Sequence, residues 1–287
     1  MLKFEVDPAG SPANRSGPHV PKAPLTSAPQ SSPAAPAAQP LAGRVALITG
    51  GARGIGRAAA RKLAAAGADV IVNYYNSHDE AEALCAELRA LGRRALSVQG
   101  SVADVASVDD MFVAIAREFP RLDIVVSNAA SGVLKPAMEM TLKHWRWCME
   151  TNAFALNLVA QHAVPMMPQG GRMLAMSSLG ASRAIPNYAF VGASKAALEA
   201  LVRSLAQELG PRGIRVNAVS AGVVDTDALG YFPNRERLLA EYAERTPAGP
   251  TLTPENVADA IYLLCLPEAD KITGQTIVVD GGFAISG

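Results

Sequence analysis

Two residues that can do acid–base chemistry lie close together in the second half of this chain. Tyr188 and Lys195 are seven positions apart, and the serine pair Ser177-Ser178 precedes them. A phenol can stabilise negative charge that develops on a substrate oxygen, and a nearby ammonium group favours ionisation of that phenol. The pattern indicates a site at which a substrate oxygen becomes negatively charged.

The spacing of this pair is compatible with one face of a helix. If residues 188–209 are helical, seven steps of 100° end about 20° short of two full turns. Tyr188 and Lys195 would then share a face, with about 10 Å of helix axis between them. Each residue also has a simpler interpretation, because a tyrosine at a helix start often serves only packing and a lysine is often solvated. Tyr231 is a second tyrosine that could reach the site.

A glycine cluster directly follows the first apolar run of the chain. It reads Thr49-Gly50-Gly51-Ala52-Arg53-Gly54-Ile55-Gly56. Gly50 permits a tight turn, Gly54 allows close approach of a phosphate, and Gly56 allows the next helix to pack on the strand. The start of that helix adds N–H donors and positive potential. We therefore expect a dinucleotide with its pyrophosphate at this turn, and Gly50, Arg53, Gly54, Ile55 and Gly56 as cofactor-binding residues.

Short β-branched runs alternate with amphipathic helical stretches from Arg44 onward. The runs span residues 44–48, 69–74, 94–99, 122–127, 171–177, 214–220 and 275–280. This alternation indicates a parallel sheet covered by helices on both faces, with ligands at the carboxyl ends of the strands. The expected fold is therefore α/β: a doubly wound, Rossmann-type parallel sheet of about seven strands, in a single domain over residues 41–287.

Composition excludes several other classes. Residues 1–40 are rich in Pro, Ala and Ser without periodicity, which is typical of a disordered tail. The 26 basic and 26 acidic residues balance, so neither nucleic acid nor an anionic membrane is expected as main partner. No apolar run reaches the ~18–20 residues of a membrane span. The three cysteines are far apart, without a CxxC pair or a His cluster, so we expect a cytoplasmic protein with reduced thiols and no metal site.

Several motifs taken together resemble one family. The glycine turn, Asn128-Ala129-Ala130 after the fourth strand, Asn152, and Ser178 before the Tyr/Lys pair resemble the short-chain dehydrogenase/reductase family from about residue 41 to the C-terminus. Most members of that family place the tyrosine four residues before the lysine, where this chain has Val191. The longer stretches SNAASGVLKPAMEM, YAFVGASKAALEAL and DTDALGYFPNRERLL, and His144-Trp145, are similar to enoyl-acyl-carrier-protein reductase III enzymes, which use the Tyr-x6-Lys arrangement found here.

The resemblance implies a reaction and a role for each catalytic residue. The reaction is NADPH-dependent reduction of the C2–C3 double bond of a trans-2-enoyl thioester, in fatty-acid or related acyl-chain biosynthesis. Tyr188 would stabilise the charge on the thioester oxygen and Lys195 would bind the nicotinamide ribose. Ser178 would orient the thioester, a role that Ser177 could partly take, and Asn152 would support the lysine through water.

The end of the second strand favours NADPH over NADH. It reads Asn73-Tyr74-Tyr75-Asn76, so no carboxylate is present to hold the 2′-hydroxyl of NAD, and Arg53 suits a 2′-phosphate. Ser101 replaces the aspartate that the family often has near the adenine. The further cofactor contacts that the resemblance implies are Asn73, Ser101, Val102, Asn128, Ala129, Ala130, Lys195, Gly222, Val224 and Thr226.

Residues 227–249 are predicted to form a helical lid. Its apolar residues, Leu229, Tyr231, Phe232, Leu238 and Leu239, suit an acyl chain, although a helix packed on the domain body would look the same. A basic set on the substrate side could receive an acidic acyl carrier protein or could simply be solvated; it comprises Lys143, Arg183, Arg235 and Arg237.

Small residues on the 188–209 helix and the C-terminal stretch, residues 273–282, fit a homotetramer. Two other functions stay open: a carbonyl reductase acting on a 3-oxoacyl thioester or another ketone, and, least favoured, a non-catalytic NADP-binding protein.

Overall fold

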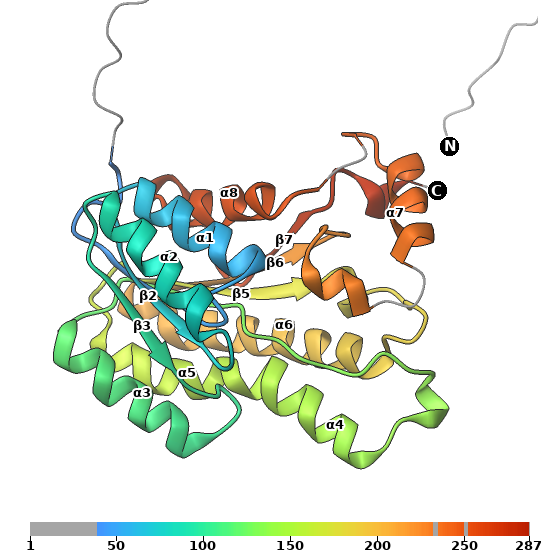
Figure 1. Ribbon diagram of the computed structural model, residues 1–287, viewed down its shortest axis with the longest axis horizontal. Helices are drawn as coiled ribbons and strands as arrows, with labels where there is room; N and C mark the ends of the chain where they lie inside the picture. Colours follow the sequence, from blue (N-terminus) through green and yellow to red (C-terminus); the bar gives the residue numbers. More distant parts are fainter. Residues whose placement is uncertain (1–38, 232–234, 250–251, 287) are drawn as a thin grey trace, which may run out of the picture. The chain divides into compact units, whose positions relative to one another are not determined.

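The computed structural model describes residues 39–286, apart from 232–234 and 250–251. The predicted tail, residues 1–40, lies almost entirely outside these residues. The described part builds one parallel sheet with helices on both faces (Figure 1).

The sheet contains seven strands in the order β3-β2-β1-β4-β5-β6-β7, and every neighbouring pair is parallel. This confirms the doubly wound α/β fold expected from the sequence. The strands are β1 Val45–Ile48, β2 Asp69–Tyr74, β3 Ala95–Gln99, β4 Ile124–Ser127, β5 Arg172–Ser178, β6 Arg215–Ala221 and β7 Thr276–Val279.

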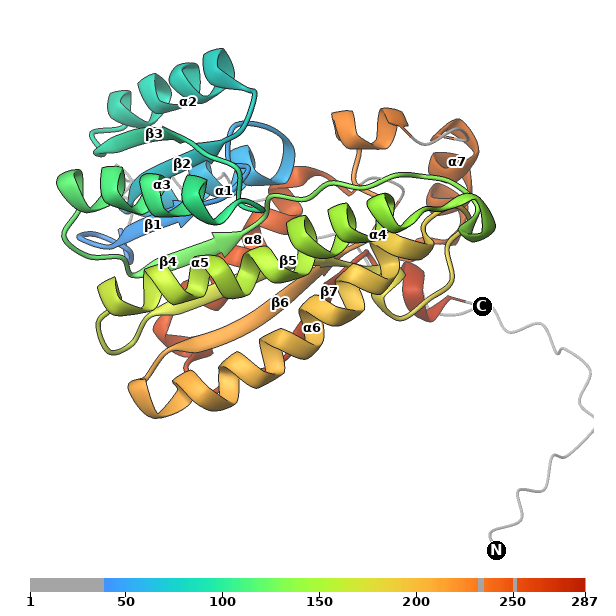
Figure 2. The ribbon, with the colours of Figure 1, turned by 90° about the horizontal axis from the view of Figure 1, so that it is seen from below.

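Three helices pack on each face of the sheet, as Figures 1 and 2 show. Helices α1 (Gly54–Ala65), α2 (His78–Ala90) and α8 (Pro254–Cys265) cover one face, and α3 (Val105–Glu118), α5 (Ala155–Ala163) and α6 (Ala189–Leu209) cover the other. The central strand β1 supplies both cores, because Ala46 and Ile48 point to the first face while Val45 and Leu47 point to the second. A strand buried on both sides must be apolar throughout, which explains its sequence.

The sheet changes direction of winding between β1 and β4. The chain leaves β1 toward β2 and β3, and then returns to place β4 on the other side of β1. In sheets of this kind, ligands bind in the crevice outside the carboxyl ends of the two strands at which the winding reverses.

The remaining helices lie near that carboxyl edge. Helix α4 (Leu142–Met149) runs through a π-helical turn, Glu150–Phe154, into α5. The expected lid contains a 3₁₀ turn, Asp227–Tyr231, and helix α7, Arg235–Arg245, beyond the strand ends of β5 to β7 in Figure 1. Among the described residues, no helix has the length and apolar character that spanning a bilayer requires.

Candidate active site

The glycine turn after β1 forms a cradle that side chains would fill. Gly50 has φ +59°, a left-handed conformation that favours glycine. A Cβ on Gly56 would come within 2.4 Å of the Gly50 carbonyl oxygen and 2.6 Å of the Asn128 amide nitrogen. A side chain at Gly56 would therefore collide with the backbone of the turn, so the helix and the turn pack together only because this residue is glycine.

The turn is tied to the loop after β4 by two side chains. Thr49 Oγ1 accepts hydrogen bonds from the backbone N–H groups of Asn128 and Ala129, at 3.0 and 3.1 Å. In return, the Asn128 side-chain amide donates to the carbonyls of Thr49 and Gly50, at 3.0 and 2.9 Å. Asn128 therefore fixes the loop after β4 against the glycine turn, in addition to the cofactor contact predicted for it.

Asn73 supports the same turn from behind. Its side chain is 1% exposed, its Oδ1 accepts from the Gly50 N–H at 3.3 Å, and its Nδ2 donates to the carbonyls of Val98 and Gly100. These bonds link β2 and β3 to the glycine turn. Asn73 was predicted as a direct cofactor contact, but the structure shows its side chain occupied by backbone groups behind the turn.

The start of α1 is open to an anion. Arg53 is the N-cap residue, its exposed side chain makes no capping hydrogen bond, and the first turn of α1 contains no acidic residue. The first N–H groups of this helix and its positive dipole end therefore have no side-chain carboxylate as a partner. Gly54 and Ile55 are half-buried at the same point, as expected for residues beside a pyrophosphate.

The other predicted cofactor residues lie on loops at this edge of the sheet. Ser101 and Val102 follow β3, and the Ser101 N–H donates to Ser107 Oγ at 2.8 Å. Ala129 and Ala130 follow β4, while Gly222, Val224 and Thr226 follow β6. A Cβ on Gly54 would lie 3.5 Å from the Thr226 methyl group, so the loops after β1 and β6 approach each other.

Tyr188 lies just before α6 and not within it. The helix begins at Ala189, Tyr188 is its N-cap residue, and the preceding Asn187 has φ +63°. A continuous helix from Tyr188 to Lys195 was expected, and this is wrong for Tyr188, which lies one residue before the helix. The Tyr188 hydroxyl donates to Ser178 Oγ at 3.3 Å. Burial raises the pKa of Tyr188, partly opposed by that hydrogen bond, so the phenol is protonated at neutral pH.

The two serines, Ser177 and Ser178, make different hydrogen bonds. Ser178 Oγ accepts from Tyr188 and from the Gly180 N–H, so it faces the loop that carries the phenol. Ser177 is 6% exposed and donates to Glu199 of α6 at 2.6 Å. Of the two serines, Ser178 is thus the one in contact with Tyr188, and the role predicted for it toward the thioester stays a prediction.

Lys195 is buried on α6 and reaches the same strand as Ser178. It is 5% exposed, and its Nζ donates to the Met176 carbonyl at 2.7 Å. Met176 and Ser178 are two residues apart on β5, or roughly 7 Å. Burial lowers the pKa of Lys195 to about 8. The phenol and the ammonium group are therefore both anchored at the carboxyl end of β5, although Tyr188 is outside the helix.

Asn152 lies in the π-helical turn and joins three elements. Its amide accepts from the Ser131 N–H and donates to the Ser131 carbonyl, each at 2.8 Å, and also donates to Ser194 Oγ at 2.9 Å. Ser194 precedes Lys195 directly. Asn152 thus positions α6 and the loop after β4, and the predicted water contact to the lysine stays a prediction.

At the position four residues before Lys195, Val191 packs tightly against backbone. Val191 is 7% exposed, and a Cβ on Gly132 would lie 2.3 Å from its methyl group Cγ2. A hydroxyl donor is therefore replaced here by a hydrocarbon that fills the space beside the loop after β4. Tyr188 is the phenol that the described residues place next to Ser178.

The lid is anchored through a residue that sequence reasoning missed. Tyr242 of α7 is 1% exposed and donates to the Asp280 carbonyl at 2.6 Å. A Cβ on Gly222 would lie 2.9 Å from the Tyr242 hydroxyl, so the loop after β6 is packed against the lid. The signal in the sequence was Tyr242 itself, one helical turn after the apolar pair Leu238 and Leu239, which are half-buried. Phe232 and the side chain of Tyr231 lie outside the described residues.

One residue of the predicted basic set is already paired. Arg235 donates to Asp225 at 2.7 Å, across a hollow of about 560 Å³ that Thr226, Asp227 and Gly230 also line. Arg183, Arg237 and Lys143 are exposed. No group of three or more His, Cys, Asp or Glu residues that could hold a metal occurs among the described residues.

The sequence of this chain matches one family model and several named proteins. A family model described as Enoyl-(Acyl carrier protein) reductase matches residues 50–284. The 1-cyclohexenylcarbonyl-CoA reductase of Streptomyces collinus is 41% identical over 84% of this chain and 87% of that protein. A hydroxynaphthalene reductase-like protein of Metarhizium brunneum is 37% identical over 84% of this chain and 95% of that protein.

Solved structures with the same fold carry nicotinamide cofactors. A short chain dehydrogenase from Burkholderia cenocepacia in complex with NADP matches with a TM-score of 0.80 and 36% identity, over 85% of this chain and 99% of that one. A blue fluorescent protein from a metagenomic library in complex with NADPH matches with a TM-score of 0.79 and 36% identity, over 86% and 100% of the two chains.

We expect Gly56→Ala to weaken NADPH binding by about tenfold or more, because the new methyl group displaces the Gly50 carbonyl and the Asn128 amide. Gly210→Ala is the matched control, since nothing lies within 4 Å of a Cβ there. Fluorescence titration with NADPH measures both variants. Equal affinity of the two variants would show that the turn does not hold the cofactor.

The buried lysine predicts a pH dependence of stability in the absence of cofactor. Between about pH 8 and the ordinary value of 10.5, the unfolded chain binds more protons at Lys195 than the folded chain does, so stability rises with pH in this window. Relative to Lys195→Met, the wild type should gain on the order of 2–3 kcal/mol over this range. Urea unfolding from pH 7.5 to 10 measures it, with exposed Lys143→Met as control. A constant difference across the range would contradict the burial of the ammonium group.

Proposed function

The chain belongs to the short-chain dehydrogenase/reductase family of oxidoreductases, and we propose that it uses NADPH to reduce the C2–C3 double bond of a trans-2-enoyl thioester. The observation that carries the proposal is the contact between Tyr188 and Ser178, the last residue of β5. Val191, which has no proton to donate, occupies the usual tyrosine position, and the Tyr188 hydroxyl lies 3.3 Å from Ser178 Oγ.

The residues at the crevice fit a bound NADPH. The cradle of Gly50, Gly54 and Gly56 and the open start of α1 suit the pyrophosphate. Arg53 is exposed beside them, and no carboxylate ends β2, which suits a 2′-phosphate. Lys195 would hold the nicotinamide ribose, by exchanging its bond to the Met176 carbonyl for bonds to the ribose hydroxyls.

The chemistry of the proposed reaction requires a donor at the thioester oxygen. When bound, NADPH supplies a hydride to the β-carbon of the substrate. The electron pair of the C2–C3 double bond then moves toward the carbonyl, and negative charge collects on the thioester oxygen. Tyr188, whose pKa is raised by burial, donates a hydrogen bond to that oxygen. Ser178 accepts the hydrogen bond of the free phenol and so orients it, and a proton from water, added at the α-carbon of the enolate, completes the reduction.

The names of two relatives support two different substrates, an enoyl thioester and a ketone. A 1-cyclohexenylcarbonyl thioester carries a double bond conjugated to its carbonyl, as an enoyl thioester does, and the relative named for it is 41% identical. The hydroxynaphthalene reductase-like relative, at 37%, keeps a carbonyl reductase as the alternative. The buried Val191 favours the enoyl substrate. A non-catalytic NADP-binding role is third, because it leaves the Tyr188–Ser178 contact without a purpose.

Other features extend the proposal to substrate and assembly. The half-buried Leu238 and Leu239 on α7 are suited to an acyl chain, delivered by coenzyme A or an acyl carrier protein in fatty-acid or related biosynthesis.

A homotetramer contact is suited by two sets of exposed residues. These are the aromatic residues Trp147 and Phe154, on and after α4, and Ala196 and Ala200 of α6. The three free, buried cysteines agree with a cytoplasmic location.

The reaction class is tested with purified protein, NADPH and matched thioesters. We expect absorbance at 340 nm to fall with crotonyl-CoA and to stay constant with acetoacetyl-CoA, because in the proposed reaction Tyr188 stabilises an enolate oxygen and Val191 leaves the usual tyrosine position without a proton donor. Repeating the assay with crotonyl-acyl carrier protein compares the two carriers. Oxidation of NADPH with the ketone alone would establish the carbonyl reductase, and binding without oxidation would establish the third function.

Tyr188→Phe tests the phenol directly. Turnover of the enoyl thioester should fall by about a hundredfold or more, since one donor at the developing oxyanion is removed. NADPH affinity should stay within about twofold, because the ring remains packed beside Gly180. Tyr75→Phe, at a tyrosine that is 64% exposed, is the matched control. Unchanged turnover in the Tyr188 variant would remove this residue from the mechanism.

A further inference from the structure

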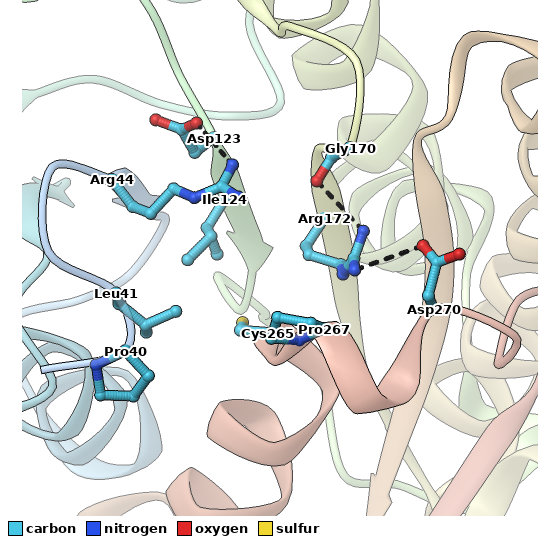
Figure 3. Close-up of a pocket in the computed structure, with 10 residues that line it drawn as sticks. All are labelled: Pro40, Leu41, Arg44, Asp123, Ile124, Gly170, Arg172, Cys265, Pro267 and Asp270. Atoms are coloured by element: carbon cyan, nitrogen blue, oxygen red, sulfur yellow. Dashed lines mark hydrogen bonds and ion pairs between the residues drawn. The ribbon is translucent and has the colours of Figure 1, made fainter. Parts of the chain in front are cut away.

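A second cavity lies at the opposite edge of the sheet from the glycine turn. It has a volume of about 160 Å³ and lies at the amino ends of β4 and β5, where Arg44 and Arg172 flank it (Figure 3). Strand β5 runs from Arg172 to Ser178, so the cavity and the proposed active site are about 20 Å apart. No part of the proposed reaction uses it.

Positive charge exceeds negative charge in the ion-pair network around this cavity. The buried carboxylate of Asp123 binds both Arg44, at 3.0 Å, and Arg121. The carboxylate of Asp270 lies 3.5 Å from Arg172 and 3.3 Å from Arg215. Four guanidinium groups and the Lys271 ammonium group, which lies 3.9 Å from Asp270, therefore share two carboxylates, which leaves three positive charges of this network uncompensated.

Arg172 is the most deeply buried of these cations. It is 7% exposed, its Nη1 donates to the carbonyls of Gly170 and Gly171, and its Nε has no hydrogen-bond partner among the described residues. Burial lowers the pKa of Arg172; Asp270 opposes this effect, and the charges of Arg215 and Arg44 add to it. A buried guanidinium with so weak a counter-charge is stabilised by any anion that can reach it.

Two carboxylates also line the cavity, those of Asp123 and Asp270, and both are bound to arginines; the other side chains of its wall are apolar. Leu41, Ile124, Pro267 and Cys265 line the cavity between the two arginines (Figure 3). Burial raises the pKa of Cys265 to about 12, so its sulfur is a neutral thiol and belongs to the apolar part of the wall. A volume of 160 Å³ equals that of about five liquid water molecules, which is enough for roughly five or six non-hydrogen atoms.

We propose that this cavity binds a small carboxylate with a short apolar tail, of the size of butyrate. The carboxylate meets Arg44 and Arg172, because planar guanidinium groups pair well with carboxylate oxygens. The tail lies against Leu41, Ile124 and Pro267. This site is independent of the proposed reductase reaction, since it shares no residue with the glycine turn or with the Tyr188–Ser178 pair.

Calorimetric titration of the full chain with butyrate tests the proposal. We expect saturable binding with a Kd within about tenfold of 1 mM. Butanol carries the same tail without charge and inorganic phosphate carries charge without a tail, so each should bind at least about tenfold more weakly.

Two variants locate the site. Arg44→Gln should weaken butyrate binding by about tenfold, while Asp123 keeps its bonds to Arg121 and to the Val45 N–H, so the fold is retained. Arg117→Gln removes an exposed positive charge from α3 and is the matched control, expected within about twofold of the wild type. Cys265→Met fills part of the cavity without changing charge, and should also weaken binding.

Three outcomes would each overturn the assignment. The first is the absence of saturable heat with butyrate up to about 50 mM. The second is an equal loss of affinity in Arg44→Gln and Arg117→Gln, which means a general charge effect. The third is binding of butanol or phosphate as tight as that of butyrate, which excludes a site that recognises both the carboxylate and the tail. Thermal unfolding of each variant, measured by circular dichroism, confirms that the comparison is made between folded proteins.

Discussion

The candidate site depends on how buried backbone polar groups are satisfied in the crevice between β1 and β4. The two loops that leave these strands cannot pair with each other as strands do, so side chains replace the missing hydrogen bonds. Thr49 and Asn128 exchange bonds across the crevice, and Asn73 holds the glycine turn from β2. Because these side chains satisfy the rear of the turn, its glycines can present backbone to a phosphate on the other side.

Strand β5 organises the reactive groups in the same way that β1 organises the cofactor cradle. Its last residue, Ser178, receives the Tyr188 hydroxyl, and its Met176 carbonyl receives Lys195. The phenol and the amine therefore come from a loop and a helix, but a single rigid strand sets their separation. Burial acts on both groups: it raises the pKa of the phenol and lowers the pKa of the amine to about 8. Charge that develops on a substrate oxygen would meet the Tyr188 hydroxyl as a hydrogen-bond donor.

The two edges of the sheet differ in their electrostatics. The carboxyl edge carries glycines, amides and hydroxyls, with Lys195 as the buried cation of the proposed site. The amino edge carries arginines paired with Asp123 and Asp270, around an otherwise apolar cavity. The first N–H groups of α1 suit the pyrophosphate of a dinucleotide, whereas the arginines of the amino edge suit a small anion. The two proposed sites are separated by the length of the strands.

The sequence by itself determined the seven strands, the sheet type, the glycine turn and the Tyr188–Lys195 spacing, because apolar periodicity and glycine geometry are local properties of the chain. It did not determine that Tyr188 precedes α6, since the left-handed conformation of Asn187 and the packing of the Tyr188 ring beside Gly180 are not visible in a local pattern. Nor did it separate Ser177 from Ser178, place Asn73 behind the turn, or identify Tyr242 as the anchor of the lid. The amino-edge cavity joins residues near positions 41, 123, 172 and 267. Such features arise from contacts between residues far apart in the chain, and only the packed sheet brings those residues within reach of one another.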